Sequence, residues 1–217
     1  MRDFFEEHLR PWLLHRAMSH GPLRPYRERV VGQARGRVLE IGVGSGLNLP
    51  YFGSEVDALV GLDPSRPLLD RARAAAARLS VPAEFIEGLA EELPFEDRSF
   101  DTALCTFTLC SVTDPARVLD ELRRVLRPNG RLLFVEHGRA PERSVAAWQD
   151  RLAPCWCRLS GGCHLNRAPL ELLAGAGFQL EGVCAGYLHR PKVVGYLTEG
   201  CARRGGEAPP PNPTRRP

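Results

Sequence analysis

The sequence predicts an α/β protein with a seven-stranded, mostly parallel sheet that carries helices on both of its faces. Apolar, β-branched runs alternate with helical segments, which is typical of β-α-β units with right-handed crossovers. The 217 residues suffice for one large domain with a substantial core but leave little room for two. The strand candidates are 37–42, 57–62, 83–87, 100–106 and 131–136, with a final strand pair at 178–186 and 191–198.

Helical segments precede, separate and follow these strands. Residues 3–20 carry an apolar stripe that Pro11 interrupts, and a second helix is expected over 25–33. An alanine-rich helix begins after its N-cap residue Ser65 and runs through Leu79. The next helix begins at Asp114-Pro115 and ends before the turn "RPNG". The last two are 145–159, whose apolar residues recur at helical spacing around a kink expected at Pro154, and 168–175.

The organisation follows from these elements and from the composition of the two ends. We expect N-terminal helices over 1–35, a central domain over 36–200 and a disordered tail rich in proline and arginine over 203–217. The tail has four arginines against one glutamate, a charge of 4 − 1 = +3. The rest of the chain, with 3 − 3 = 0, gives no electrostatic reason to expect nucleic-acid binding.

The absence of a long apolar run and of a signal-peptide pattern indicates a cytoplasmic protein. No apolar run reaches the ~18 residues that span a bilayer, and the N-terminus lacks the pattern of a signal peptide. The seven cysteines are therefore expected to be reduced thiols. Cys155, Cys157, Cys163 and His164 are grouped, but C-x-C-x5-C-H is not a usual zinc pattern, so no metal is predicted.

A glycine cluster follows the first strand in "VLEIGVGSGLNLPYF" and indicates close backbone approach to a ligand. A dinucleotide fingerprint needs G-x-G-x-x-G, but Leu47 occupies the third glycine position, and Gly42, Gly44 and Gly46 form G-x-G-x-G instead. Pyrophosphate needs amides and a helix N-terminus. S-adenosylmethionine (SAM) has no phosphate, and its ammonium group favours an acid such as Glu40, at the end of the strand.

Two further acids follow at the ends of the second and third predicted strands, where they could contact a cofactor. Asp63 ends the second strand, ~20 residues after the glycines, where an acid can accept hydrogen bonds from both ribose hydroxyls, and Pro64 follows it. "EGLAEELPFEDRSFDTALC" then places Ala90 and Glu91 after the third strand. Because both cofactor classes use an acid after strand two, Asp63 alone does not separate them. For Glu91, which precedes another acid, Glu92, a solvated acidic face is the alternative.

Together these motifs resemble the class I SAM-dependent methyltransferases of the type 11 group. The matching pieces are the "hLEhGxGxG" pattern, Asp63, the "LPF…FD" stretch and "VLDELRRVLRPNGRLLFVEH". The resemblance implies a Rossmann-like sheet with an antiparallel last strand and SAM as the cofactor. The cofactor-binding residues so indicated are Glu40, Gly42, Gly44, Gly46, Asp63, Pro64, Ala90, Glu91, Thr106 and Leu109.

The acceptor is expected beside the loop after strand four, "CTFTLCSV". In the strand order that the resemblance implies, this loop lies at the switch point of the sheet, where ligands bind. A thiol or phenol acceptor must lose a proton, and His137 is the candidate general base, although an ordinary loop histidine is an equal alternative. Thr108, Cys110 and His164 are the candidate substrate-binding residues.

Several segments point to one branch of the family, which includes membrane-associated thiol methyltransferases and bacterial relatives. "CTFTLCSV", "FVEHG", "GGCHLNR" and "PKVVGY" are similar to that branch, which overlaps quinone C-methyltransferases and phosphatidylethanolamine N-methyltransferases. We expect a small apolar acceptor: a thiol, a quinol-type ring or a lipid headgroup. A non-catalytic SAM-binding module that acts through a protein partner is the alternative, and a NAD-dependent oxidoreductase is more distant.

The N-terminal segment differs from the long apolar anchor of the eukaryotic members. It is shorter and amphipathic, with Phe4, Phe5, Trp12 and Leu13. We expect a lid or a helix packed on the sheet rather than a helix at a membrane surface, because its polar face is not rich in lysine or arginine. Peripheral membrane contact through this helix stays open, and the sequence indicates no oligomeric state.

Overall fold

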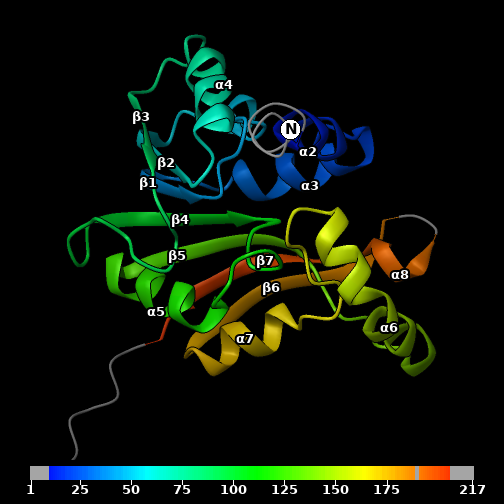
Figure 1. Ribbon diagram of the computed structural model, residues 1–217. Helices are drawn as coiled ribbons and strands as arrows, with labels where there is room; N and C mark the ends of the chain where they lie inside the picture. Colours follow the sequence, from blue (N-terminus) through cyan, green and yellow to red (C-terminus); the bar gives the residue numbers. More distant parts are fainter. Residues whose placement is uncertain (1–9, 189–190, 206–217) are drawn as a thin grey trace, which may run out of the picture.

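A computed structural model describes residues 10–188 and 191–205, and its centre is one seven-stranded sheet with helices on both faces (Figure 1). The strand order is β3-β2-β1-β4-β5-β7-β6. Neighbouring strands from β3 to β5 are parallel, whereas β7 is antiparallel to both β5 and β6. The predicted fold class, antiparallel last strand included, is confirmed.

The described elements agree with most of the predicted segments. The strands are β1 (Gly36–Ile41), β2 (Val56–Asp63), β3 (Ala83–Glu87), β4 (Phe100–Thr106), β5 (Leu126–His137), β6 (Phe178–Tyr187) and β7 (Tyr196–Arg204). The α-helices are α2 (Arg10–Met18), α3 (Arg24–Val31), α4 (Arg66–Ala76), α5 (Pro115–Val125), α6 (Arg143–Leu159), α7 (Pro169–Gly175) and α8 (Lys192–Gly195), and two 3-10 helices are η2 (Gly21–Leu23) and η3 (Leu49–Tyr51).

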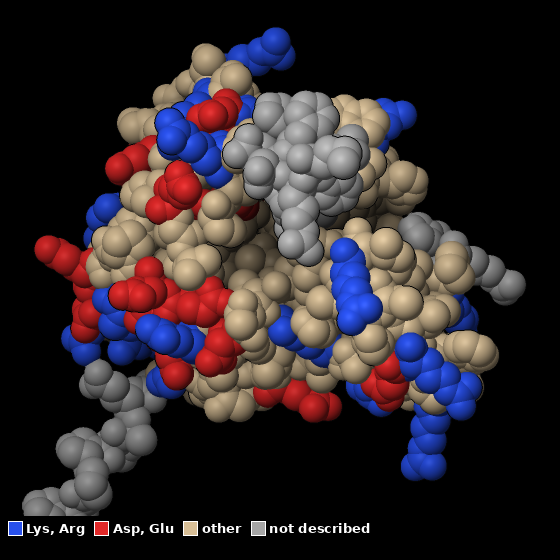
Figure 2. Space-filling view, viewed as in Figure 1, with Lys and Arg blue, Asp and Glu red and all other residues tan. Residues whose placement is uncertain are grey.

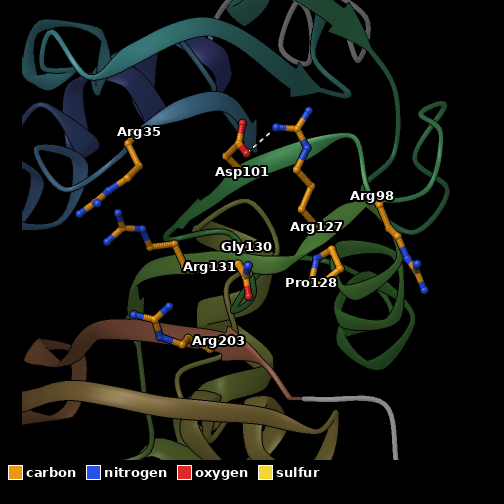
Figure 3. A pocket seen from close by; sticks show the side chains of 9 residues that line it. Arg35, Arg98, Asp101, Arg127, Pro128, Gly130, Arg131 and Arg203 are labelled. Atoms are coloured by element: carbon orange, nitrogen blue, oxygen red, sulfur yellow. Dashed lines mark hydrogen bonds and ion pairs between the residues drawn. The ribbon is translucent and has the colours of Figure 1, made fainter.

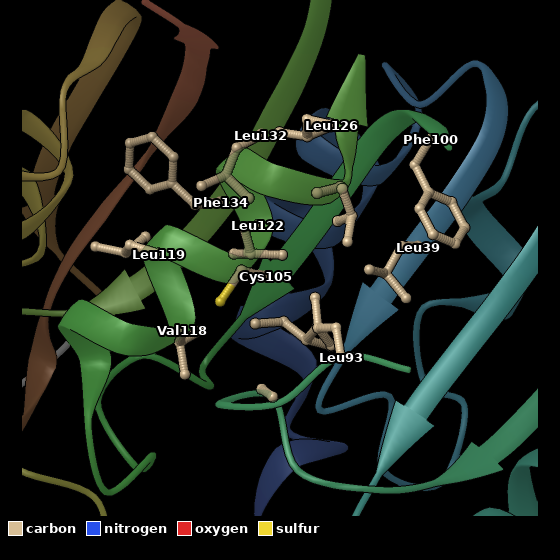
Figure 4. Close-up of a cluster of buried hydrophobic side chains, with 14 of the residues drawn as sticks. Leu39, Leu93, Phe100, Cys105, Val118, Leu119, Leu122, Leu126, Leu132 and Phe134 are labelled. Atoms are coloured by element: carbon tan, nitrogen blue, oxygen red, sulfur yellow. The ribbon is translucent and has the colours of Figure 1, made fainter. Parts of the chain in front are cut away.

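Side-chain alternation along the strands divides the core into two layers. In β1, Val38 packs with residues of α3 and α4 on one face, whereas Leu39 and Ile41 pack with residues of α5 on the other. Figure 4 shows the second layer, in which Leu119 and Leu122 of α5 lie against the sheet. The sheet is thus covered on both sides, so ligands can reach it only at its edges and strand ends.

The helix α5 shows how local sequence signals set an element. Asp114 is its N-cap, and the carboxylate accepts hydrogen bonds from the backbone N–H groups of Ala116 and Arg117, both at 3.1 Å. The predicted cap is therefore confirmed. At α4, by contrast, the N-cap residue Ser65 makes no side-chain capping hydrogen bond, and the helix ends at Ala76, before the predicted Leu79.

The end of the chain differs from the prediction. The last strand was expected at 191–198, but residues 192–195 form α8 and the strand is Tyr196–Arg204. It pairs with the long buried strand β5 from His137↔Leu197 to Arg131↔Arg203. Arg203 and Arg204 therefore belong to β7 rather than to a disordered tail. Residues 206–217 of that predicted tail, and 3–9 of the first predicted helix, lie outside the described residues.

The predicted apolar stripe of α6 is not its buried face. Trp148 is 54% exposed and Leu159 86%, whereas Ala146, Gln149 and Ala153 are buried. Gln149 anchors the helix, because its Oε1 accepts from the Ala140 N–H and its Nε2 donates to the Gly138 carbonyl.

No helix of the described residues is long and apolar enough to cross a bilayer.

The surface in Figure 2 carries lysine and arginine side chains mixed with aspartate and glutamate. This mixture fits the near-zero charge of the chain outside its tail. The same face is hollowed near its centre, where uncharged side chains gather.

Candidate functional site

The strand order reverses between β1 and β4, and the loops after these two strands therefore meet at one crevice. Gly42, Gly44 and Gly46 have φ angles of 65°, 55° and 78°, which L-residues rarely adopt. A Cβ on Gly42 would lie 2.2 Å from Thr108 Oγ1. The glycine at this position is thus required for the loop after β4 to pack against the loop after β1.

Glu40 lies near the end of β1, just before the glycine loop, and is 1% exposed. Its Oε1 accepts a hydrogen bond of 2.6 Å from Asn48 Nδ2, and its Oε2 has no partner among the described residues. Burial raises the pKa of Glu40 to about 8, opposed by the Asn48 hydrogen bond and the Arg27 charge. An unsatisfied buried carboxylate oxygen is costly unless a ligand donates to it.

Asn48 and Arg27 form a polar network around Glu40 that the sequence did not indicate. Asn48 Nδ2 also donates to Thr106 Oγ1 at 2.9 Å, and its Oδ1 accepts from Arg27 Nη1 at 2.6 Å. Arg27 is only 6% exposed, and its guanidinium lies over the Phe107 ring, 5.5 Å from its centroid. A buried arginine in a segment predicted only as an N-terminal helix could not be recognised without its distant partners.

Asp63 joins the end of β2 to the glycine loop. Its Oδ2 accepts from the Gly44 N–H at 2.9 Å, and its Oδ1 accepts from the Ser65 N–H at 2.8 Å. Burial raises the pKa of Asp63, and these two hydrogen bonds oppose the effect. Pro64 is exposed beside it. The predicted proximity of this acid to the glycine loop is thus present in the structure.

Glu136 is a third buried acid of the site, after Glu40 and Asp63, and the prediction omitted it although "FVEHG" contains it. The backbone N–H groups of Thr108, Leu109 and Cys110 donate to its carboxylate at 2.8, 2.9 and 3.2 Å. The Cys105 thiol donates to it as well, at 3.2 Å. A carboxylate at the end of β5 therefore holds the loop after β4 in place.

The residues after β3 are arranged differently from the prediction. Ala90 is buried, but Glu91 Oε1 accepts from the backbone N–H groups of Thr113 and Asp114, at 2.9 and 3.3 Å. Glu91 therefore supports the start of α5, and its contact with a cofactor stays a prediction. The neighbouring Leu89 is 59% exposed, a large apolar surface at this strand end.

The candidate acceptor residues lie together in part. His137 Nδ1 is 3.7 Å from Cys163 Sγ, and Cys110 Sγ belongs to the same group of side chains. His164 instead faces Cys157, with 3.6 Å between Nε2 and Sγ, while its backbone N–H donates to the Cys110 carbonyl. Burial, followed by the charge of Arg167, lowers the pKa of His164.

The N-terminal helix α2 contacts the glycine loop directly. His15 Nδ1 and Ser45 Oγ are 2.6 Å apart, and Arg27 Nη2 donates to the Met18 carbonyl at 3.3 Å. Trp12 and Leu13 are each 47% exposed. The helix therefore lies over the glycine loop, with apolar side chains still open to solvent.

A cavity of about 540 Å³ lies at the amino ends of the parallel strands, opposite the candidate site, and is not part of that site (Figure 3). Its lining comes from the amino ends of β1, β4 and β5 and from the last residues of β7, including Arg35, Arg127 and Arg203. These three arginines pair with Glu55, Asp101 and Glu181. Ligands of open parallel sheets bind at the carboxyl ends of the strands, so this cavity is not a candidate for the cofactor.

The residues of the crevice fit SAM better than a dinucleotide. The unpartnered Glu40 Oε2 suits an ammonium group. The glycine loop leads into turns and the short η3, and no α-helix begins within the described residues 42–55 to face a pyrophosphate. A glycine loop, a buried acid and a second acid at the end of β2, all at the switch point, define the class of Rossmann-like SAM-binding proteins.

Comparison with known proteins agrees with the assignment to Rossmann-like SAM-binding proteins. The family described as "Methyltransferase domain" matches residues 39–134. Thiol S-methyltransferase TMT1A of Homo sapiens is 32% identical over 173 residues, 75% of this chain and 70% of that protein. The chain belongs to the SAM-dependent methyltransferase family.

Other relatives differ in their named reactions. Thiol S-methyltransferase TMT1B of Rattus norvegicus is 37% identical over 151 residues, 66% of this chain and 62% of that protein. Phosphatidylethanolamine N-methyltransferase of Cereibacter sphaeroides is 38% identical over 120 residues, 54% and 59% of the two chains. These matches span about three-fifths of the relatives' own lengths.

Solved structures show the same fold. A SAM-dependent methyltransferase from Methanosarcina mazei has a TM-score of 0.65 at 23% identity and covers 87% of this chain and 99% of its own. The [4+2]-cyclase SpnF has a TM-score of 0.68 at 21% identity and covers 85% and 80%. Because one of these proteins is named a cyclase, the reaction of this chain must be argued from the site and not from the fold.

Proposed function

We propose that this protein transfers the methyl group of SAM to the sulfur of a small apolar thiol. The observation that carries the choice of acceptor is the neutrality of the loop after β4. Residues 107–112 contain no charged side chain, and the adjacent carboxylate of Glu136 is fully engaged by backbone N–H groups. An ammonium headgroup would need a free carboxylate there, whereas a thiol does not. The similarity to thiol S-methyltransferases TMT1B and TMT1A supports the same choice.

The cofactor roles follow from the geometry of the crevice. We assign Glu40 Oε2 to the ammonium group of SAM and Asp63 to the ribose hydroxyls, with Gly42, Gly44 and Gly46 as the cradle. When bound, SAM supplies an electrophilic methyl group on a cationic sulfur. The buried network of Arg27 and Asn48 holds Glu40 in one orientation. Fixing donor and acceptor in line can supply much of the rate acceleration.

The thiol proton has one evident acceptor among the predicted residues. His137 Nδ1 already faces Cys163 Sγ, so Nε2 is the ring nitrogen left for a substrate proton. Leu109 and Cys110, both nearly fully buried, supply the apolar wall of the acceptor side. Thr108 Oγ1 donates to backbone carbonyls of Ile41 and Thr106, both at 3.2 Å, and therefore shapes the loop.

An acceptor screen tests the proposal. Release of S-adenosylhomocysteine would be measured with an alkyl thiol, an aromatic thiol, a quinol and phosphatidylethanolamine vesicles. We expect turnover with the thiols and at least a tenfold loss of SAM affinity in Asp63→Asn. The control Asp70→Asn, on the exposed face of α4, should bind SAM normally. Turnover only with the quinol or the lipid would reject the thiol, and SAM binding without any turnover would favour a regulatory module.

We further propose that α2 acts as a lid over the glycine loop of a cytoplasmic enzyme. The His15–Ser45 contact supports the lid. The half-exposed Trp12 and Leu13 are the candidates for peripheral membrane contact. Deleting residues 1–20 should weaken SAM binding, whereas Trp12→Ala/Leu13→Ala should leave it intact. Loss of liposome binding in the double variant would indicate an additional membrane role, and unchanged SAM affinity in the deletion would reject the lid.

A further inference from the structure

Three potential metal ligands meet beside the acceptor loop, although they come from separate parts of the chain. Cys110 follows β4, His137 ends β5, and Cys163 lies in the loop between α6 and α7. Their ligand atoms, two sulfurs and one imidazole nitrogen, all lie within 4.8 Å of one another. Cys110 is 2% exposed and Cys163 is 7% exposed, while His137 is half-buried.

The distance between Cys163 Sγ and His137 Nδ1 suits tetrahedral coordination of one ion, and Cys110 Sγ lies within 4.8 Å of both atoms. Zinc binds thiolate sulfur at ~2.3 Å and imidazole nitrogen at ~2.0–2.1 Å, which places the two atoms ~3.6 Å apart around a tetrahedral centre. Cys163 Sγ and His137 Nδ1 are 3.7 Å apart. Two thiolates and one imidazole are soft and borderline ligands that select zinc over magnesium or calcium.

Two of the three residues, Cys110 and His137, are held by protein contacts outside the group. The Cys110 N–H donates to Glu136 Oε2 at 3.2 Å, and the Cys110 carbonyl accepts from the His164 N–H at 2.7 Å. The His137 ring packs edge-on against Phe107, with 5.6 Å between centroids. Metal ligands that are oriented by such surrounding contacts bind more tightly than mobile ones.

The grouping differs from the one that the sequence suggested. Of the candidates Cys155, Cys157, Cys163 and His164, only Cys163 belongs to it. Cys155 is exposed, and Cys157 pairs with His164. Spacing along the chain missed the group because its members are 27 and 26 residues apart, 137 − 110 and 163 − 137.

We infer that Cys110, His137 and Cys163 bind one zinc ion whose fourth position takes the sulfur of the acceptor. Three protein ligands and an open fourth position are typical of catalytic rather than structural zinc. On coordination the S–H bond of the acceptor breaks, a zinc–sulfur bond forms, and the proton passes to solvent. The coordinated thiolate keeps a lone pair for attack on the methyl carbon of SAM, whose bond to the sulfonium sulfur breaks and releases S-adenosylhomocysteine. His137 is then a ligand rather than a base, and this part of the inference rests on the proposed thiol acceptor.

Metal binding is tested on the full chain without any acceptor. The protein would be stripped with a chelator and then titrated with Zn²⁺ against a chromophoric competitor, and with Co²⁺ to follow thiolate-to-cobalt absorption. We expect one ion per chain, and at least a hundredfold loss of affinity in Cys110→Ser, Cys163→Ser and His137→Ala. Cys155→Ser and Cys184→Ser, both at exposed cysteines, are matched controls that should bind normally. Retained SAM binding shows that each variant is folded.

Four outcomes decide between the alternatives. No zinc uptake by the wild type, or an equal loss in Cys157→Ser and Cys163→Ser, would overturn the site and leave a thiol–imidazole hydrogen bond in its place. Thiol methylation at full rate by zinc-free enzyme would overturn coordination of the acceptor while the proposed function stands. Zinc uptake without thiol methylation would support the metal site and reject the proposed acceptor. A cobalt spectrum that shifts when a thiol is added would support the fourth position directly.

Discussion

Replacing Glu40 with glutamine should make the SAM-free protein more stable and abolish SAM binding. The carboxyl is fully buried with one hydrogen-bond donor, and its pKa lies at about 8 instead of 4.5. Between pH 4.5 and about pH 8 the Glu40 carboxyl loses its proton in the unfolded chain but keeps it in the folded chain. Stability therefore falls as pH rises, by about 1.4 kcal/mol per unit.

The magnitude follows from the shift. At pH 7 the folded chain holds the carboxyl protonated about 2.5 units above the ordinary pKa of 4.5, which costs on the order of 3 kcal/mol. Glutamine has no such cost. Its Oε1 keeps the hydrogen bond from Asn48, and its amide nitrogen replaces a protonated Oε2 that also lacks a partner. Each protein thus leaves one polar group without a partner at this position, an O–H group in the wild type and an amide NH2 group in the variant.

Urea unfolding of the wild type and Glu40→Gln at pH 5 and pH 7 measures the effect. The variant should gain about 3 kcal/mol at pH 7 and less than about 1 kcal/mol at pH 5. SAM at 100 times its Kd should stabilise the wild type by about 2.7 kcal/mol and leave the variant unchanged. Glu84→Gln, at an exposed position of β3, is the control. Equal stability of the variant and the wild type at pH 7, or normal SAM affinity in the variant, would refute this account.

Three further substitutions probe the same crevice. Gly42→Ala combines a positive φ with a Cβ 2.2 Å from Thr108 Oγ1 and should lower the stability measured in thermal unfolding by about 2–4 kcal/mol. The control Gly53→Ala, whose Cβ would have nothing within 4 Å, should be neutral. Equal effects of the two substitutions would contradict the close approach of the two loops. Glu136→Gln replaces a carboxylate oxygen, which accepts from a backbone N–H group, with an amide nitrogen that can only donate. Turnover should therefore fall while SAM affinity persists. Normal turnover would argue against a role of Glu136 in positioning the loop after β4. Asn48→Ala removes the hydrogen-bond partner that the buried Arg27 and Glu40 share and should destabilise by about 2–5 kcal/mol. A loss under about 1 kcal/mol would count against the network.

The parallel part of the fold was predictable because its signals are local. Most strands up to β5 contain a short buried apolar run, and the helices between them carry caps or prolines at their ends. The last strand was not predicted correctly, because Val193 and Val194 resemble a strand while Arg203 and Arg204 resemble a tail. Pairing with β5 decides the outcome there. A contact that depends on a strand 60 residues earlier in the chain leaves no local pattern.

The candidate site was predictable where one residue carries the signal by itself. Positive-φ glycines and acids at strand ends are recognisable in a sequence, and Glu40 and Asp63 lie where they were expected. Arg27 was missed because only its distant partners give it a role. The cysteines were grouped by proximity in the chain, whereas the structure brings Cys110 and Cys163 from two loops together with His137 at the end of β5.

Glu40 and Glu136 show how a ligand-binding acid differs from a structural one in the same crevice. Both are fully buried, and desolvation raises the pKa of each. Glu136 accepts four hydrogen bonds that favour its charged form, so it has satisfied partners without any ligand. Glu40 accepts one, and its second oxygen has no partner among the described residues. A buried carboxylate that the protein leaves half-satisfied is unfavourable for folding. Since a cationic ligand would offset that cost, the difference between the two acids identifies Glu40 as the one whose partner comes from outside the chain.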